Sequence, residues 1–98
     1  MKPITHDHIK QYVRVSDKCY SMLLRRQTDS EESLSHVIKR LVDADLYSPT
    51  VVYQNQELNR RIYVNLELKK KLYEIKKERG VGKYDEVVWR LVVNGSKR

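Results

Sequence analysis

The residues best suited to metal or acid–base chemistry lie together only near the amino terminus, in His6-Asp7-His8. Two imidazoles and a carboxylate are potential metal ligands, but protein zinc sites use three or four ligands. We therefore interpret this stretch as part of a mobile tail rather than as a metal site. The rest of the chain has no paired acid and base and no glycine-rich phosphate loop. This pattern predicts that the protein is not an enzyme and uses no cofactor or metal.

Positive charge is the other chemically informative feature. The 98 residues include 20 Lys/Arg and 13 Asp/Glu, a formal net charge of +7. The excess is uneven, with eight basic and seven acidic residues up to Pro49, and twelve and six from Thr50 onward. Such a charge favours a polyanionic partner, although basic surfaces also serve solubility alone. We expect Lys69-Lys70-Lys71 and Lys76-Lys77 to form a solvated helix face that raises non-specific affinity more than specificity.

Two segments of the chain share one pattern, which is a short alternating strand, a capping residue, a helix, a tight turn and a second helix. In the first segment Val13 and Val15 alternate with polar neighbours, and Ser16 offers an oxygen to the free amides of a helix over 17–27. A polar turn follows over 27–33. Apolar residues then recur at the spacing of an amphipathic helix. They are Leu34, Val37, Ile38, Leu41 and Val42.

The second segment repeats the first with a shift of 49 residues in the strand and first helix, and of 50 in the second helix. Ile62 and Val64 replace the two valines, Asn65 replaces the capping serine, and Gly80 is suited to a left-handed helix stop. The apolar stripe of the second helix is matched position for position. Its residues are Tyr84, Val87, Val88, Leu91 and Val92. Because one unit is too small to bury its own core, we expect the two copies to pack together.

The repeat divides the chain into a first motif at residues 8–45, a linker at 46–58 and a second motif at 59–95. We expect a mainly α fold with a short antiparallel β-ribbon, in which the two motifs form one domain. The linker contains Val51-Val52-Tyr53, which could form a further short strand or cover apolar surface. The sequence leaves these two alternatives open.

Nothing in the sequence indicates a membrane segment or export. No apolar run approaches the ~18 residues of a membrane-spanning helix, and the amino terminus lacks a signal-peptide pattern. The single cysteine, Cys19, excludes an internal disulfide and a Cys-rich zinc site, and we expect it to be a small core residue. The expected location is therefore cytoplasmic, with no membrane partner.

A strand, a cap and two helices in about 35 residues resemble the ribbon-helix-helix DNA-binding family of the Arc, MetJ and CopG type. In the first copy the resemblance lies in residues 13–16 and 33–41, which are similar to archaeal antitoxin-type members. In the second copy it lies in Val64-Asn65, Arg79-Gly80 and 85–88. The tandem layout is similar to that of archaeal-virus transcription regulators. The resemblance implies a tandem ribbon-helix-helix that forms an intrachain pseudo-dimer, associated with double-stranded DNA.

In that family the two strands pair into a ribbon that lies in the DNA major groove, with outward side chains at the base edges. A two-stranded ribbon fits this groove, and its alternate side chains share one face. Arg and Lys suit guanine, Asn suits adenine, and Tyr suits a phosphate or a thymine methyl group. The base-contacting residues implied here are Lys10, Tyr12, Arg14, Asn59, Arg61 and Tyr63. The family also binds a phosphate at the amino end of each second helix, which implies contacts at Ser33, Ser35 and Lys83.

Three further features of the sequence carry predictions. Gln11 and Arg60 occupy inward positions where the pattern requires apolar residues, so we expect a ribbon core only two residues deep per strand. The outward triads of the two strands differ, which predicts an asymmetric recognition site. Trp89 and Val93 align with charged residues of the first copy, and such extra apolar surface predicts an interface with the linker or with a second chain. The second option implies a homo-oligomer through the last helix.

These observations predict a sequence-specific double-stranded DNA-binding transcription regulator, such as a repressor. The alternative is an antitoxin-type interaction module that neutralises a toxin partner and binds its own promoter. In that case Val51-Val52-Tyr53 could be the toxin-binding segment. Only a few residues follow the expected last helix, which favours the regulator over the antitoxin, because antitoxins use a disordered tail after the DNA-binding unit.

Overall fold

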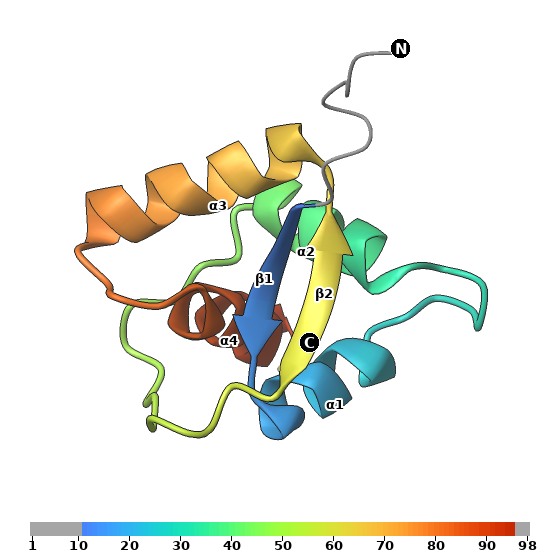
Figure 1. Cartoon of the computed structure of the whole chain (residues 1–98), viewed down its shortest axis with the longest axis horizontal. Coiled ribbons are helices and arrows are strands. Elements are labelled where there is room, and N and C mark those ends of the chain that lie inside the picture. Colours follow the sequence, from blue (N-terminus) through green and yellow to red (C-terminus); the bar gives the residue numbers. More distant parts are fainter. Residues whose placement is uncertain (1–10, 96–98) are drawn as a thin grey trace, which may run out of the picture.

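The computed structural model describes residues 11–95 as four helices and a two-stranded antiparallel sheet (Figure 1). In chain order these elements are β1 (Gln11–Val15), α1 (Asp17–Arg25), α2 (Leu34–Asp43), β2 (Arg60–Val64), α3 (Leu66–Arg79) and α4 (Tyr84–Gly95). The expected mainly α fold with a short antiparallel β-ribbon is confirmed.

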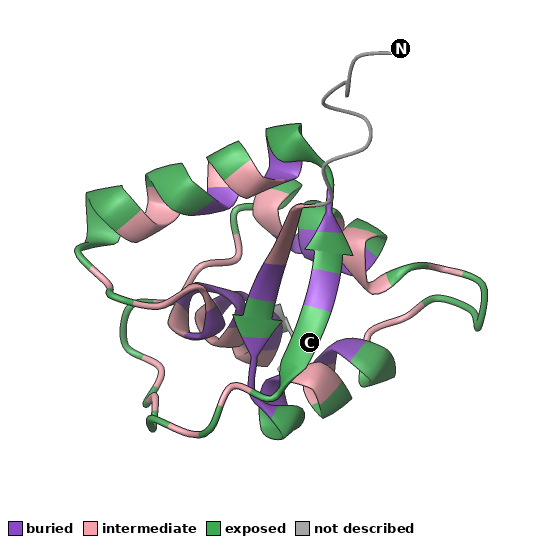
Figure 2. Ribbon diagram, in the orientation of Figure 1, coloured by how far each residue is buried: buried purple, intermediate pink, exposed green. Residues whose placement is uncertain are grey.

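The ribbon is formed by two strands that lie far apart in the sequence. β1 and β2 pair antiparallel, with Val13 opposite Ile62. Because successive side chains of a strand point to opposite faces, alternate residues enter the core. The buried ones are Val13, Val15, Ile62 and Val64. The outer face of the ribbon remains at the surface (Figure 2), and the core is two residues deep per strand, as predicted.

The ends of the helices follow from local sequence. Ser16 precedes α1, and its side-chain oxygen accepts a hydrogen bond from the Cys19 amide at 3.2 Å. Asn65 precedes α3 and accepts from the Leu68 amide at 2.7 Å. Both contacts satisfy amides that the first helical turn leaves free. Gly80 ends α3 with φ of 68°, a left-handed conformation that glycine adopts without steric cost. These three sequence predictions are confirmed.

The two halves of the chain interlock. α3 and α4 contact β1, whereas α2 contacts β2, so three of the four helices lie against the strand of the other half (Figure 1). α4 also contacts the other three helices. Its inner residues Val87, Val88, Leu91 and Val92 are almost completely buried. One core therefore forms from both halves, and it includes Cys19, as expected.

Arg60 shows how the ribbon ends its core. It belongs to the same inward row as Ile62 and Val64, but its side chain reaches the surface beyond Val15, its partner on β1. The guanidinium lies 2.6 Å from a carboxylate oxygen of Asp17 and 4.8 Å from the ring centroid of Tyr20. Gln11, at the other end of the inward row, is half-buried. Polar residues at both ends thus limit the apolar face to its centre.

Candidate nucleic-acid interface

The outer face of the ribbon carries two arginines and two tyrosines. Arg14 lies opposite Arg61, and Tyr12 lies opposite Tyr63. The two tyrosine rings meet edge to face with their centroids 5.8 Å apart, and the Arg61 guanidinium lies 4.9 Å from the Tyr12 centroid. Tyr12 is half-buried and the other three are exposed. The structure therefore brings four of the six predicted base-contacting residues together on one surface, which we call the outer ribbon face.

The remaining two predicted base-contacting residues are Lys10 and Asn59. Lys10 lies outside the described residues. Asn59 directly precedes β2, and its amide nitrogen donates a hydrogen bond to the Asp17 carboxylate at 3.2 Å. The Asn59 amide is therefore engaged within the chain, and it would have to leave Asp17 to reach a base edge.

The pairing of Arg14 with Arg61 is a feature that the sequence pattern did not reveal. Like charges directly opposite each other on a sheet are destabilising. Among residues 11–95, neither guanidinium has a carboxylate partner within ion-pair distance. The ring of Tyr12 offsets part of this repulsion for Arg61 through a cation–π contact. The outer ribbon face therefore concentrates positive charge that an anionic partner would stabilise.

The carboxylate of Glu32 lies beside the start of α2. Ser33 caps the helix by accepting from the His36 amide at 3.0 Å. The neighbouring Glu32 carboxylate accepts hydrogen bonds from Arg40 at 2.7 Å and from the Thr28 amide at 2.7 Å, and lies 2.6 Å from His36 Nδ1. These bonds, with Arg40 the largest contributor, hold the pKa of Glu32 well below its usual range. Glu32 is thus charged at neutral pH and opposes a second anion there.

The predicted phosphate contacts lie on different flanks of the ribbon. Ser33 and Ser35 are at the start of α2, which packs on β2. Lys83 directly precedes α4, which packs on β1. Lys83 is half-buried and has no carboxylate partner within the described part of the chain. Asp85 and Glu86 lie in the first turn of α4, so carboxylates of the chain lie near both helix starts.

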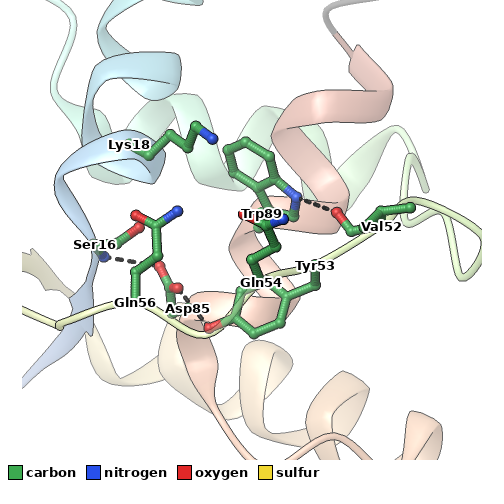
Figure 3. Close-up of a pocket in the computed structure, with 8 residues that line it drawn as sticks. All are labelled: Ser16, Lys18, Val52, Tyr53, Gln54, Gln56, Asp85 and Trp89. Atoms are coloured by element: carbon green, nitrogen blue, oxygen red, sulfur yellow. Dashed lines mark hydrogen bonds between the residues drawn. The ribbon is translucent and has the colours of Figure 1, made fainter.

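Asp85 is a buried carboxylate whose role sequence reasoning missed. One of its oxygens accepts the Ser16 amide at 2.9 Å, and the other accepts the Tyr53 hydroxyl at 2.7 Å (Figure 3). It therefore joins α4 to the start of α1 and to the linker. Burial and the bond to Asp85 raise the pKa of Tyr53, and burial raises the pKa of the Cys19 thiol. Both groups stay protonated at neutral pH.

Trp89 lies against the linker. Its indole nitrogen donates to the Val52 carbonyl at 2.8 Å, and the Lys18 ammonium lies 5.9 Å from a ring centroid of the indole (Figure 3). A small cavity of about 200 Å³ remains between the indole, Lys18 and the linker. Val93 is half-buried against the core. Of the two interfaces predicted for this surface, the linker contact is confirmed for Trp89.

Arg90 completes the attachment of the linker. Its guanidinium donates to the carbonyls of Pro49, at 2.7 Å, and of Val51, and it pairs with Glu86 at 3.0 Å. We call these contacts, together with Trp89–Val52 and Tyr53–Asp85, the linker clasp. Residues 51–53 form no strand. They are attached to α4 by the hydrogen bonds of the linker clasp, and Val52 is exposed, so the cover of apolar surface by Val51-Val52-Tyr53 stays a prediction.

Alanine at Arg90 is expected to loosen the linker clasp, because one guanidinium supplies the bonds to several linker carbonyls. Trp89 is the only tryptophan of the chain and therefore reports the change without interference. We expect its fluorescence emission to shift to longer wavelength and its quenching by iodide to increase. Arg25→Ala, which removes an exposed arginine elsewhere, is the control. An unchanged spectrum for Arg90→Ala would show that the clasp does not depend on Arg90.

Comparison with protein-family models, with curated proteins and with solved structures gave no match. Among residues 11–95, no helix is long and apolar enough to cross a membrane. The same residues contain no group of three or more His, Cys, Asp or Glu arranged to hold a metal ion. His6 and His8 lie outside the described residues.

Proposed function

We propose that this chain is a sequence-specific double-stranded DNA-binding transcription regulator of the ribbon-helix-helix type. In this proposal the ribbon enters the major groove and its outer face contacts base edges. One observation carries the proposal. The outer face of an exposed two-stranded ribbon has two tyrosines and two arginines, and within residues 11–95 neither arginine has a carboxylate partner within ion-pair distance, while the inner face is core. Strands spaced about 4.8 Å apart make a ribbon that fits a groove about 12 Å wide.

The strand register supports an intrachain pseudo-dimer built from the two motifs. Val13 and Ile62 occupy equivalent positions in the two copies, and they are also direct partners across the ribbon. A two-fold axis between two copies requires such self-pairing of equivalent positions. The exchange of partners, with α3 and α4 on β1 and α2 on β2, is likewise what two interlocked copies produce.

Affinity in this proposal comes mainly from phosphate contacts, and specificity comes from the bases. Arg14 and Arg61 are assigned to guanine edges, and Tyr12 and Tyr63 to phosphate or thymine methyl groups. Lys83 is assigned to a phosphate beside α4. Ser33 and Ser35 remain candidates for the opposite phosphate, weakened by the neighbouring carboxylate at the start of α2.

Selection of binding sites from a random duplex library at ~0.15 M salt tests this function. The parent is expected to enrich one short asymmetric sequence, because the two strands present different residues. A variant with alanine at Tyr12, Arg14, Arg61 and Tyr63 is expected to enrich none. Arg25→Ala/Lys77→Ala, which removes the same charge from exposed helix positions, serves as the control and should enrich the parental sequence. Failure of the parent to enrich any sequence would overturn the proposal.

A further inference from the structure

A groove on the β1 side of the ribbon is lined by residues of β1, of α3 and of the start of α4. Its volume is about 590 Å³. Tyr12 and Arg14 of the outer ribbon face line it together with Lys69, Lys76 and Lys83. Among the described residues, no Asp or Glu lines this space. We call it the α3–α4 groove, and it is continuous with the outer ribbon face through the two residues that they share.

Two lysines of α3 are held inside this groove by aromatic rings. The Lys69 ammonium lies 5.9 Å from the Tyr12 centroid and 5.7 Å from the Tyr84 centroid, and the Lys76 ammonium lies 5.1 Å from Tyr84. Both lysines are half-buried, with stems that can lie along apolar surface. The expectation of a solvated lysine face is therefore wrong for Lys69 and Lys76, although it describes the exposed Lys70.

These contacts position positive charge without neutralising it, because an aromatic ring attracts a cation but carries no net charge. Within residues 11–95, none of the four groove cations has a carboxylate partner within ion-pair distance. They are Arg14, Lys69, Lys76 and Lys83. The groove thus presents a concentrated positive field at a concave surface, the arrangement that attracts a polyanion.

The opposite flank of the ribbon has a different composition. The repeat places Tyr20 and Gln27 where the second copy has Lys69 and Lys76, so the two lysines have no counterpart there. Two of the cations on that flank, Arg60 and Arg40, are already paired within the chain. Arg60 lies 2.6 Å from an Asp17 carboxylate oxygen, and the Glu32 carboxylate is bonded to Arg40. The groove side of the ribbon therefore has two unpaired lysines at positions where the other flank has uncharged residues.

We propose that the α3–α4 groove is a one-sided binding site for the sugar-phosphate backbone of the duplex that the ribbon engages. Lys69 and Lys76 contact phosphates beyond the major-groove edge, and no equivalent contacts form on the β2 side. This inference rests on the proposed DNA-binding function and adds a directional element to it. A duplex backbone is favoured over an acidic protein because the groove opens directly onto the outer ribbon face through Tyr12 and Arg14.

The salt dependence of duplex binding tests the site. Anisotropy of a labelled duplex carrying the selected sequence is measured from 50 to 300 mM KCl for the parent and two double variants. Lys69→Gln/Lys76→Gln removes the groove charges, and Lys70→Gln/Lys77→Gln removes equal charge at the same spacing from exposed positions of the same helix. The logarithm of the binding constant falls with the logarithm of the salt concentration, and each lost phosphate contact makes this slope shallower by about 0.9. We expect a decrease of about 1.8 for the groove variant and less than half of that for the control.

Ethylation interference on the same duplex shows on which side of the recognised sequence the additional phosphates are contacted. Interfering phosphates are expected to extend farther on one side of the recognised sequence, and the extra ones should lose their effect in the groove variant alone. Equal changes of slope in the two double variants, or a symmetric pattern of interference, would overturn the one-sided site. An acidic protein would then be the favoured ligand of the groove. Absence of duplex binding by the parent would instead overturn the proposed function, so the two failures are distinguishable. Thermal melting of each variant establishes that it is folded.

Discussion

Alanine at Arg14 or Arg61 is expected to lower the preference for the selected duplex over random duplex by about 1–3 kcal/mol each, if each guanidinium binds a guanine edge in bidentate geometry. The expected loss for both together is close to the sum only if the two arginines read separate base pairs. Competition binding at fixed salt with specific and random duplexes measures this preference directly.

Substitution of Arg14 is also expected to affect the stability of the fold. Because Arg14 and Arg61 are direct partners across the ribbon, removing one charge relieves a repulsion between like charges. We therefore expect Arg14→Gln to have a melting temperature equal to or above that of the parent, while its discrimination falls. If Arg14 instead stabilised the fold, Arg14→Gln would lower the melting temperature. A variant that melts lower and keeps its discrimination would contradict the assignment of this pair to base contacts.

Features set by local sequence could be predicted well. The strand alternation around Val13 and Val15 places one face in the core, since the side-chain period of a strand is two. The helix starts at Ser16 and Asn65 follow from side-chain oxygens that reach free amides within three residues. The left-handed stop at Gly80 follows from the conformational freedom of glycine. None of these predictions required knowledge of the tertiary structure.

Features set by tertiary register could not be predicted in the same way. The pattern placed Arg14 and Arg61 on the same face, but only the pairing of β1 with β2 makes them direct partners. Lys69 and Lys76 have the same side-chain chemistry as the exposed Lys70. Their difference lies in the ring of Tyr84, which α4 brings beside α3. A helix-based pattern contains no information about such a neighbour.

Asp85 gives the clearest example of a hidden role. An acidic residue in the first turn of a helix is common, because it favours the helix dipole. The sequence therefore offered a sufficient local reason for Asp85, which concealed its contacts with Ser16 and Tyr53 at separations of 69 and 32 residues. A carboxylate buried to 1% relative exposure holds three separate segments together. Its removal should consequently be the most damaging single polar substitution in the described chain.

Alanine at Asp85 is expected to lower the free energy of unfolding by about 2–4 kcal/mol. Hydrogen bonds to a charged acceptor contribute about 1.5–3 kcal/mol, and a buried donor left without a partner costs about 1–3 kcal/mol. The buried Ser16 amide would lose its hydrogen-bond acceptor, and the Tyr53 hydroxyl would lose its acceptor on α4. Urea unfolding followed by circular dichroism measures the change. In a domain of this size each kcal/mol corresponds to roughly 4–8 °C in melting temperature.

Two further variants separate the contributions of the two bonds. Tyr53→Phe removes only the linker bond, so we expect a smaller loss than for Asp85→Ala, together with a change in Trp89 emission because the clasp is weakened. Asp85→Asn keeps an acceptor oxygen for the Ser16 amide and should be milder than alanine. Asp29→Ala, in the exposed turn between α1 and α2, removes only an exposed hydrogen bond from the Glu31 amide and should change stability by less than about 0.5 kcal/mol. If Asp85→Ala unfolds at the parental urea concentration, the buried carboxylate does not hold the two halves together, and their association depends on the apolar core alone.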